Sequence, residues 1–300
     1  MSNEMKKARL IYNPRSGLGI TSITMSLERI VALYAEHGIE LEVREIDFES
    51  EAALLLAGLD ENYDHLLIAG GDGTVNYVVS EMLREGLDLP IGIIPSGTAN
   101  DFASAIGMRS NPIDACHQVL ECKPQLTDIG EVNGQCFVNV FSFGLFTNVS
   151  QHTPTLLKNA IGKAAYVVGG AIDFVKMHPI PIEILSDDGD WSGNALIVLV
   201  FNGKTAGNFP LAKMAEVDDG YLDVLVLKAG VVPALAAAPA FLHYIFGGGE
   251  EPPRDVLHFR CSRISISSSL SEPTDVDGQP GPDLPVKMYC RAGALRVIRP

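Results

Sequence analysis

Short apolar runs alternate with helix-length segments over residues 8–120, and this alternation constrains the fold most. Four runs predict strands, namely ARLIYN, LEVREI, HLLIAG and LPIGIIP. The segments between them carry apolar residues at helical spacing, as from Ile23 to Tyr34 before Gly38 and from Val75 to Leu83 before Gly86. Strands that are nearly continuous in apolar residues and separated by helices predict a parallel sheet covered on both faces. We therefore expect residues 1–127 to form a doubly wound α/β domain.

The second half of the chain has a different texture. Its strand candidates are FVNVFSFG, ALIVLVFN, YLDVLVL, HFRCSRISIS and ALRVI. Ile264 and Ile266 alternate with Ser265 and Ser267, which is the period of two expected where one face of a strand meets water. Residues 156–177 and 231–249 are helix candidates. We expect residues 128–300 to form a β-rich, sandwich-like domain, with the site in a cleft between the two domains.

Composition narrows the class of protein. The formal net charge of -15 repels nucleic acid and anionic membranes unless a local basic patch overrides it, so a nucleic-acid partner is excluded. For an anionic membrane, a basic patch of this kind is predicted on one helical segment, formed by Lys158, Lys163 and Lys176. The five cysteines show no zinc spacing and predict free thiols in a reducing compartment. The N-terminus lacks the apolar stretch of a signal peptide, and the 231–249 run contains Pro and His, so a cytoplasmic protein is expected.

Three glycine-bearing loops follow predicted strands: NPRSGLG at 13–19, GGDGT at 70–74 and PSGTAND at 95–101. Glycine lets the backbone approach an anion, and the amides at a helix N-terminus attract phosphate. For one loop alone a structural role would suffice, since Thr74 could cap its helix and Asp72 could close the turn. Because the carboxyl ends of parallel strands share one sheet edge, three such loops together favour a polyphosphate site. GLGITS and GKT fail the standard nucleotide fingerprints.

Carboxylates supply the remaining candidates. Asp72 and Asp101 sit in two of these loops, and paired oxygens there suit Mg²⁺ bridging phosphates. Two further acidic turns, VDDGYLD at 217–223 and DVDGQPGPD at 275–283, need no function, because Asp-Gly is a common hairpin dipeptide.

Taken in order, NPRSG, GGDGTVN, IPSGTANDFA, IGKAAY, NGKTAGNF, DDGYLD and VDGQP resemble the diacylglycerol kinase catalytic family, which includes bacterial lipid kinases and the sphingosine and ceramide kinases. The resemblance runs nearly end to end. It implies a nucleotide-binding α/β domain, a β-sandwich-like domain, and ATP-dependent phosphorylation of a lipid hydroxyl. GGDGT alone would also fit NAD kinases.

The resemblance also implies site residues. Those expected to line the nucleotide site are Asn13, Pro14, Arg15, Ser16, Gly17, Gly71, Asp72, Gly73, Thr74, Val75, Asn76, Tyr77 and Thr98. Asp72 and Asp101 would join a magnesium and water network. A structural magnesium would be held by the Asp219 side chain, with carbonyls near Glu216 and Tyr221.

Three positions depart from the family pattern. Tyr77 replaces a glutamate, a threonine is absent near Ile46 and Asp47, and Gln279 stands where the family has its proton-accepting glutamate. A neutral amide cannot take a proton, and general base catalysis typically contributes about 10²- to 10⁴-fold. Asp277 is a substitute base if the segment is extended, because alternate residues of a strand share a face. The other interpretation is that Asp277 only shapes the turn.

The sequence thus predicts a lipid kinase that uses ATP and Mg²⁺, attached transiently and peripherally to the inner membrane face, with a homodimer as a further expectation. Two alternatives stay open. One is a pseudokinase that binds nucleotide or lipid without transferring phosphate, which Gln279 motivates. The other is a kinase of a soluble substrate of the NAD kinase type, against which the D-D-G and D-G-Q turns count.

Overall fold

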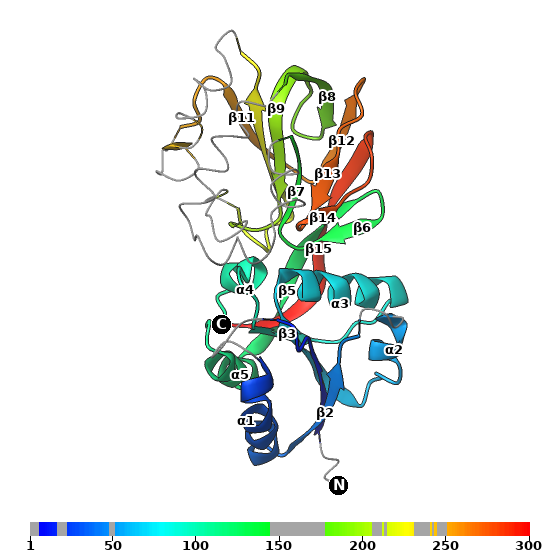
Figure 1. Cartoon of the computed structure of the whole chain (residues 1–300), viewed down its shortest axis with the longest axis vertical. Helices are drawn as coiled ribbons and strands as arrows, with labels where there is room; N and C mark the ends of the chain where they lie inside the picture. The colour runs from blue at the N-terminus through cyan, green and yellow to red at the C-terminus, as the bar shows by residue number, and fades with distance from the viewer. Residues whose placement is uncertain are drawn as a thin grey trace. The chain divides into compact units, whose positions relative to one another are not determined.

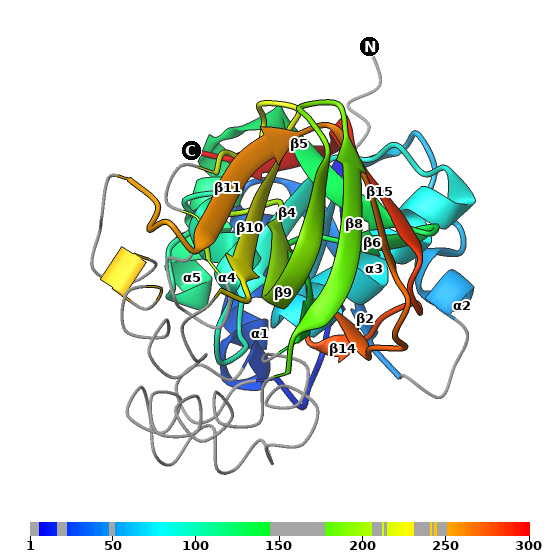
Figure 2. The ribbon, with the colours of Figure 1, turned by 90° about the horizontal axis from the view of Figure 1, so that it is seen from above.

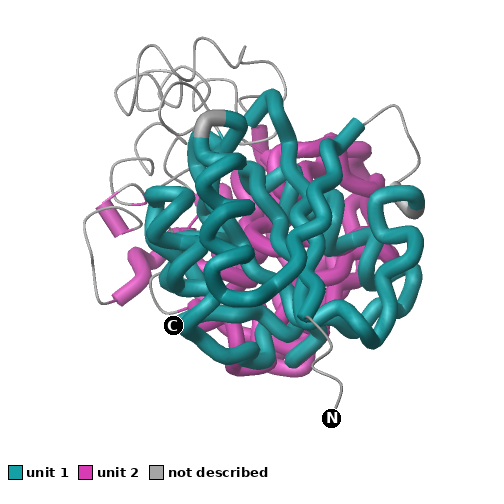
Figure 3. The backbone as a smooth tube through the Cα atoms, turned by 90° about the horizontal axis from the view of Figure 1, so that it is seen from below, with its two compact units in different colours: residues 1–127, 293–300 teal, residues 128–292 magenta. Residues whose placement is uncertain are grey.

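In the computed structural model, the chain divides into two compact units (Figure 3). Unit 1 comprises residues 1–127 and 293–300, and unit 2 comprises residues 128–292. The structure describes residues 6–16, 23–47, 52–144, 178–205, 212, 215–230, 241, 243–244 and 251–300. The division falls between Thr127 and Asp128.

Unit 1 is built on a parallel sheet with the strand order β2-β1-β3-β4-β15. Its strands are β1 Lys6–Tyr12, β2 Ile39–Glu45, β3 Tyr63–Gly70, β4 Ile91–Pro95 and the last residues of β15 Val286–Arg299. Its helices are α1 Ile23–Glu36, α2 Ala52–Leu56, α3 Asp72–Glu85, α4 Asp101–Ala105 and α5 Pro112–Glu121. The doubly wound α/β domain predicted from the alternation of apolar runs is confirmed.

Helices cover both faces of this sheet because β3 and β4 are apolar along nearly their whole length. α1 contacts α5, α2 contacts α3, and Figure 1 shows the two pairs on opposite sides of the sheet. Gly92 in β4 lets α5 pack closely, since an added Cβ would lie 2.7 Å from the Val119 side chain. The chain leaves β1 toward β2 and leaves β3 toward β4, so the strand order reverses between β1 and β3. Ligands of open α/β sheets bind at such switch points.

Residues 293–300, which were expected in the second domain, group with unit 1 in the structure. The reason is strand pairing: the end of β15 runs parallel to β4, with Val297 opposite Ile91. Val297 is fully buried there. The C-terminal strand therefore completes the first sheet.

Unit 2 is β-rich, and most of its strands pair in antiparallel fashion. Its strands are β5 Lys123–Val132, which begins in unit 1, β6 Gln135–Phe137, β7 Val140–Gly144, β8 Ile180–Ser186, β9 Trp191–Phe201, β10 Leu222–Lys228, β11 Val256–Cys261, β12 Arg263–Ser268, β13 Thr274–Val276, β14 Gln279–Pro280 and the first part of β15. Figure 2 shows β11, β10, β9 and β8 side by side.

Strands β9 and β10 are apolar at consecutive positions because both of their faces are covered. Val198 and Val224 join a large core that also contains Phe141 and Phe143. Leu199 and Leu225 point the other way, into a second cluster that contains Phe241. By contrast, Ile264 and Ile266 of β12 are buried while Ser265 and Ser267 are half-exposed, as their alternation predicted.

Two predicted strands are each two strands in the structure. HFRCSRISIS divides at Ser262, whose backbone amide donates to the Asp187 carboxylate at 3.1 Å, so β11 pairs with β10 and β12 pairs with β8. FVNVFSFG divides at Val138 and Asn139, whose amides donate to the Asp277 side chain. In both cases a distant carboxylate takes the amide that a continuous strand would give to its neighbour.

The two helix candidates, 156–177 and 231–249, fall outside the described residues except for 241, 243 and 244, and so do Lys158, Lys163 and Lys176. In the part of the chain that is described, no helix is long and apolar enough to cross a membrane. All five cysteines are free thiols, as predicted.

Arg9, in the middle of β1, is a buried charge that the apolar pattern did not reveal. The residue is only 2% exposed. Its Nε donates to Glu42 Oε2 at 2.9 Å, and its Nη1 donates to the carbonyl oxygens of Leu55 and Ala57 at 3.0 and 2.9 Å. Its guanidinium also lies 5.1 Å from the centroid of the Tyr63 ring. One side chain thus ties β1 to β2, to the end of α2 and to β3.

We predict that Arg9→Met destabilises the protein by about 2 to 3 kcal/mol, because it leaves the Leu55 and Ala57 carbonyls without their donor and removes one of the donors to the Glu42 carboxylate. Arg44→Met is the matched control, since Arg44 contacts the same Glu42 at 2.6 Å from an exposed position. Its cost should stay below about 1 kcal/mol. Chemical denaturation of both variants measures the difference, and equal losses would contradict the role given to Arg9.

Candidate active site

The loops that follow β1, β3 and β4 meet at the carboxyl edge of the unit 1 sheet. Asn13 Nδ2 donates to Thr74 Oγ1 at 3.1 Å, which joins the first loop to the second. The backbone amide of Phe102 donates to Asp72 Oδ1 at 2.9 Å, which joins the start of α4 to the start of α3. The predicted convergence of three glycine-bearing loops is therefore present.

The paired glycines of GGDGT each permit a different close approach. A Cβ on Gly70 would lie 2.3 Å from the Thr74 Cβ, so Gly70 makes room for the side chain that Asn13 binds. A Cβ on Gly97 would lie 2.4 Å from the Gly71 Cα, so the second and third loops touch through backbone atoms alone. Real Cβ atoms do not approach so closely. Glycine at 70 and 97 is therefore a condition of the loop arrangement, and a Cβ on Gly71 would lie a tight 3.1 Å from the Gly97 Cα.

The third loop is closed by Asn100. Its Oδ1 accepts from the Gly97 amide at 2.8 Å, and its Nδ2 donates to the Gly97 carbonyl at 3.0 Å. Asn100 has a left-handed backbone with φ of 56°, a conformation that asparagine tolerates better than most residues. Asp101 follows it as the first residue of α4 and is buried. The loop thus places Asp101 next to Phe102, whose amide Asp72 binds.

The helix cap suggested for Thr74, one of the local alternatives for the second loop, is not formed. Helix α3 begins at Asp72, and its N-cap is Gly71, which makes no side-chain cap, so Thr74 does not cap the helix. The Asp72 carboxylate accepts the amide of Phe102 in the neighbouring loop. Both side chains therefore link loops.

The other predicted nucleotide-site residues differ in how exposed they are. Pro14 is half-buried, Arg15 and Gly73 are exposed, and Ser16 is buried. Val75 is 2% exposed and packs in the core, so only its backbone is available to a ligand. Asn76 Oδ1 accepts from Ser80 Oγ at 3.3 Å, and Thr98 is exposed. Gly17 lies outside the described residues.

Tyr77 occupies the α3 position where the family pattern has a glutamate. Burial raises the pKa of the Tyr77 phenol above its usual value, and the carboxylates of Glu81 and Asp47 add to the rise. The phenol therefore keeps its proton and brings no negative charge to this position. Its interaction with Asp47 also places Tyr77 near the end of β2.

In unit 2, the acidic turn at 217–221 is anchored by Asp128, which the sequence analysis missed. The buried Asp128 accepts the Gly220 amide at Oδ2, at 2.6 Å, and its own amide donates to the Val217 carbonyl at 2.7 Å. Gly220 has φ of +79°, which favours glycine there. The anchor is some ninety residues away in sequence, so no local pattern signals it.

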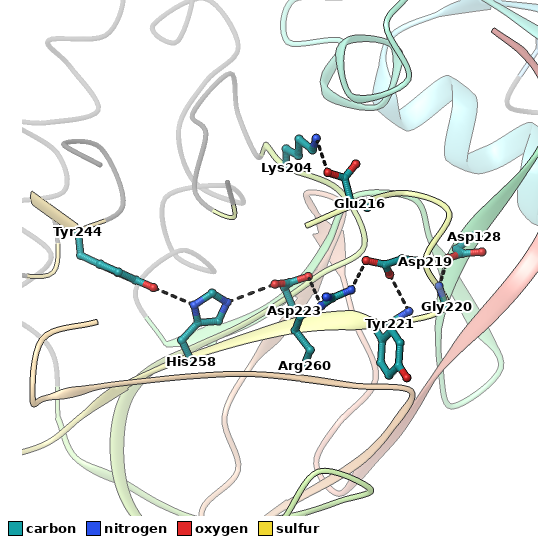
Figure 4. A network of polar contacts seen from close by, with 10 residues as sticks. All are labelled: Asp128, Lys204, Glu216, Asp219, Gly220, Tyr221, Asp223, Tyr244, His258 and Arg260. Atoms are coloured by element: carbon teal, nitrogen blue, oxygen red, sulfur yellow. Dashed lines mark hydrogen bonds and ion pairs between the residues drawn. The ribbon is translucent and has the colours of Figure 1, made fainter. Parts of the chain in front are cut away.

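Of the residues predicted to hold a structural magnesium, the side chains of Asp219 and Glu216 have partners of their own (Figure 4), while the carbonyls near Glu216 and Tyr221 stay predicted ligands. Asp219 Oδ2 contacts the Arg260 guanidinium, and Asp219 Oδ1 accepts the Tyr221 amide at 3.0 Å. Glu216 pairs with Lys204 at 3.1 Å. Burial raises the pKa of Asp219, although Arg260 and the Tyr221 amide oppose the rise. Among the described residues, no group of three His, Cys, Asp or Glu side chains is placed to hold a metal. The Asp219 side chain, the one carboxylate expected to bind a structural magnesium, is therefore paired with a cation of the chain itself.

The D-G-Q turn is a tight hairpin between β13 and β14, as the Asp-Gly dipeptide predicted, with Val276 opposite Gln279. Asp277 and Gly278 both have positive φ, 50° and 85°, as in a type I′ turn. The segment is therefore not extended, and the condition under which Asp277 and Gln279 share a face is not met. The Asp277 carboxylate accepts three backbone amides, from Val138 at 2.7 Å, Asn139 at 3.0 Å and Val140 at 2.8 Å. Gln279 is exposed.

Asn202, from the NGKTAGNF motif, connects the two acidic turns. It is fully buried, and its Nδ2 donates to the carbonyls of Asp128 at 3.0 Å and Val138 at 3.1 Å. Asp128 anchors the 217–221 turn, and the Val138 amide binds Asp277. One buried amide group thus fixes the spacing between the supports of both turns.

These features define the class of protein: an α/β domain with converging phosphate-type loops, followed by a β-sandwich-like domain. Residues 7–132 match the family model described as diacylglycerol kinase catalytic domain, and residues 139–299 match the one described as YegS C-terminal NAD kinase beta sandwich-like domain. The chain belongs to the diacylglycerol kinase family.

Individual relatives agree with this assignment. A diacylglycerol kinase of Staphylococcus saprophyticus is 31% identical over 283 residues, covering 93% of this chain and 91% of the relative. One of Bacillus subtilis is 30% identical over 301 residues, covering 99% and 97%. The crystal structure of a protein assigned as a diacylglycerol kinase from Bacillus anthracis str. Sterne matches with a TM-score of 0.84 at 25% identity, covering 100% of this chain and 99% of that one. The fold extends over the whole length of these proteins.

We predict that Gly97→Ala destabilises unit 1 by about 1 to 3 kcal/mol, because the new methyl group forces the second and third loops apart. Gly73→Ala is the control for stability: nothing lies within 4 Å of a Cβ built there, and alanine favours the first turn of a helix. Thermal unfolding should show a lower Tm for the first variant only. An unchanged Tm for Gly97→Ala would mean that the loops do not touch.

We predict that Asp277→Asn costs about 1.5 to 3 kcal/mol of stability, since it replaces a charged acceptor of three amides while asparagine still tolerates positive φ. Gln279→Glu, at an exposed position, should change stability by less than about 0.5 kcal/mol. Denaturant unfolding of both variants measures this. If Asp277→Asn were as stable as wild type but lost phosphate transfer, Asp277 would act in the chemistry instead.

Proposed function

We propose that the protein is a lipid kinase, which transfers the γ-phosphoryl group of ATP to the hydroxyl of a diacylglycerol-type lipid. The observation that carries the proposal is the convergence of three loops at the sheet's switch point, with glycine required at 70 and 97. Membership of the diacylglycerol kinase family supports the reaction class. As a lipid kinase it would work at a membrane surface and bind there peripherally.

The nucleotide would lie against the loops at Asn13–Ser16, Gly71–Tyr77 and Thr98. Amides in the first turn of a helix have no partner within the helix, so the start of α3 suits phosphate oxygens. Gly73 is exposed in that turn and would admit a ligand close to the backbone. The Asn13–Thr74 bond would keep the first loop in place while ATP enters and ADP leaves.

Asp72 and Asp101 fit a magnesium ion that accompanies ATP. They are the first residues of α3 and α4, and the Asp72–Phe102 bond brings these two helix starts together. When bound, magnesium would neutralise charge on the phosphate oxygens. The carboxylates would orient it through their oxygens, the ligand type that this ion prefers.

The next step to account for is which group accepts the proton of the lipid hydroxyl. Gln279 cannot accept it, and the Asp277 carboxylate already accepts three amides. Phosphoryl transfer passes through a loose transition state in which positioning and charge stabilisation dominate. We propose that transfer proceeds without a carboxylate base at this turn, with the proton passing to solvent, at a rate reduced by about 10²- to 10⁴-fold.

We expect wild type to transfer labelled phosphate from ATP to diacylglycerol in detergent micelles with magnesium, slowly, and Gln279→Glu to be faster by a factor of at least about 10. Asp72→Asn should abolish transfer. Gln135→Glu, a change of the same charge in β6, controls for added negative charge. The assay measures labelled lipid after extraction.

Other outcomes select the alternatives. An inert wild type that becomes active as Gln279→Glu would favour the pseudokinase. Transfer of phosphate to NAD but not to lipid would establish the soluble-substrate kinase. The match of the second domain to an NAD kinase beta sandwich-like family model is the reason to test this alternative. Absence of ATP binding would contradict the proposal as a whole.

A further inference from the structure

The acidic turn at 217–221 is paired with a positively charged side chain of the same chain, Arg260. Arg260 lies in β11, directly opposite Asp223 of β10 in the antiparallel register. Its guanidinium reaches along β10 to the turn, where Nη2 contacts Asp219 Oδ2 (Figure 4). The contact is therefore set by strand pairing as well as by charge.

Three partners surround this guanidinium. Besides Asp219, its Nε lies 3.7 Å from Asp223 Oδ2, and the group sits 5.0 Å from the centroid of the Tyr221 ring. Asp223 is only 1% exposed, so its charge needs a counter-ion from within the protein. Arginine is always charged and stacks well on aromatic rings, so it suits this position.

Two further carboxylate oxygens, one at the turn and one beside it, are also engaged. Asp219 Oδ1 accepts the Tyr221 amide at 3.0 Å, and Asp223 Oδ1 lies 3.2 Å from His258 Nε2. His258 in turn contacts the Tyr244 hydroxyl at 2.8 Å. Magnesium requires nearly octahedral oxygen coordination at about 2.0 to 2.1 Å. To reach Asp219 it would have to displace Arg260 and then lie beside a second positive charge.

We propose that the Arg260 guanidinium holds the 217–221 turn in this chain, in the place of a structural magnesium, so that unit 2 folds without bound metal. The inference concerns folding and does not rest on the proposed function. A magnesium ion that arrives with ATP at unit 1 is unaffected by it.

The first test measures metal in the nucleotide-free protein. After purification with EDTA and dialysis against metal-free buffer, the wild type should contain much less than one magnesium or calcium ion per chain by mass spectrometry. Its Tm should be the same in EDTA and in millimolar magnesium. One retained equivalent of metal, or a Tm that falls in EDTA, would overturn the proposal.

The second test removes the guanidinium. Arg260→Met should lower the Tm by several degrees and should regain part of the loss in magnesium, because two carboxylates then lack a cation. Arg260→Lys, which keeps the charge but not the planar group, should fall between wild type and Arg260→Met. Arg263→Met is the control, since Arg263 is an exposed arginine in β12.

Equal Tm values for Arg260→Met and Arg263→Met would overturn the proposal. If Arg260→Met does not fold, Arg260→Lys and the metal content of the wild type still decide. In that case a Lys variant as stable as wild type and free of metal would support an internal cation, whereas a metal-bound wild type would exclude it.

Discussion

The backbone contact between Gly71 and Gly97 is the constraint on which the site in unit 1 depends. Two parallel strands, β3 and β4, end beside each other, and the loops that follow them would be forced apart by a side chain at Gly97, whose Cβ would lie 2.4 Å from the Gly71 Cα. Because the two loops touch there, the Asp72 carboxylate reaches the Phe102 amide. The loop after β1 then joins through Asn13 and Thr74. A phosphate-type site thus follows from the absence of a Cβ atom at Gly97.

Unit 2 uses carboxylates for a different purpose. Asp128 accepts the Gly220 amide, and Asp277 accepts three amides between β6 and β7. In each case a charged acceptor satisfies amides of non-repetitive backbone, which otherwise cost stability when buried. Asn202 connects the two supports. Acidic residues in turns of this chain therefore serve first to fix backbone, and their presence alone does not indicate catalysis.

The sequence predicted what depends on local pattern. Apolar periodicity located the strands and helices around the three loops, and the Asp-Gly dipeptide located the β13–β14 hairpin. It missed what depends on contacts between distant residues. Arg9 is buried by partners more than thirty residues away, Asp128 acts on a turn ninety residues on, and Ser262 interrupts a strand because of Asp187. The counter-ion of Asp219 was missed for the same reason, since Arg260 reaches it only through the pairing of β10 and β11.

The hairpin geometry also sharpens the question raised by Gln279. The turn is held by the positive φ of Asp277 and Gly278 and by the three amides bound to the Asp277 carboxylate. None of these involves the side chain at 279, which is exposed at the start of β14. A glutamate and a glutamine at this position would therefore share the same backbone and differ only in charge and in the ability to accept a proton. Whatever difference in rate separates them would measure the contribution of a base, free of changes in the shape of the turn.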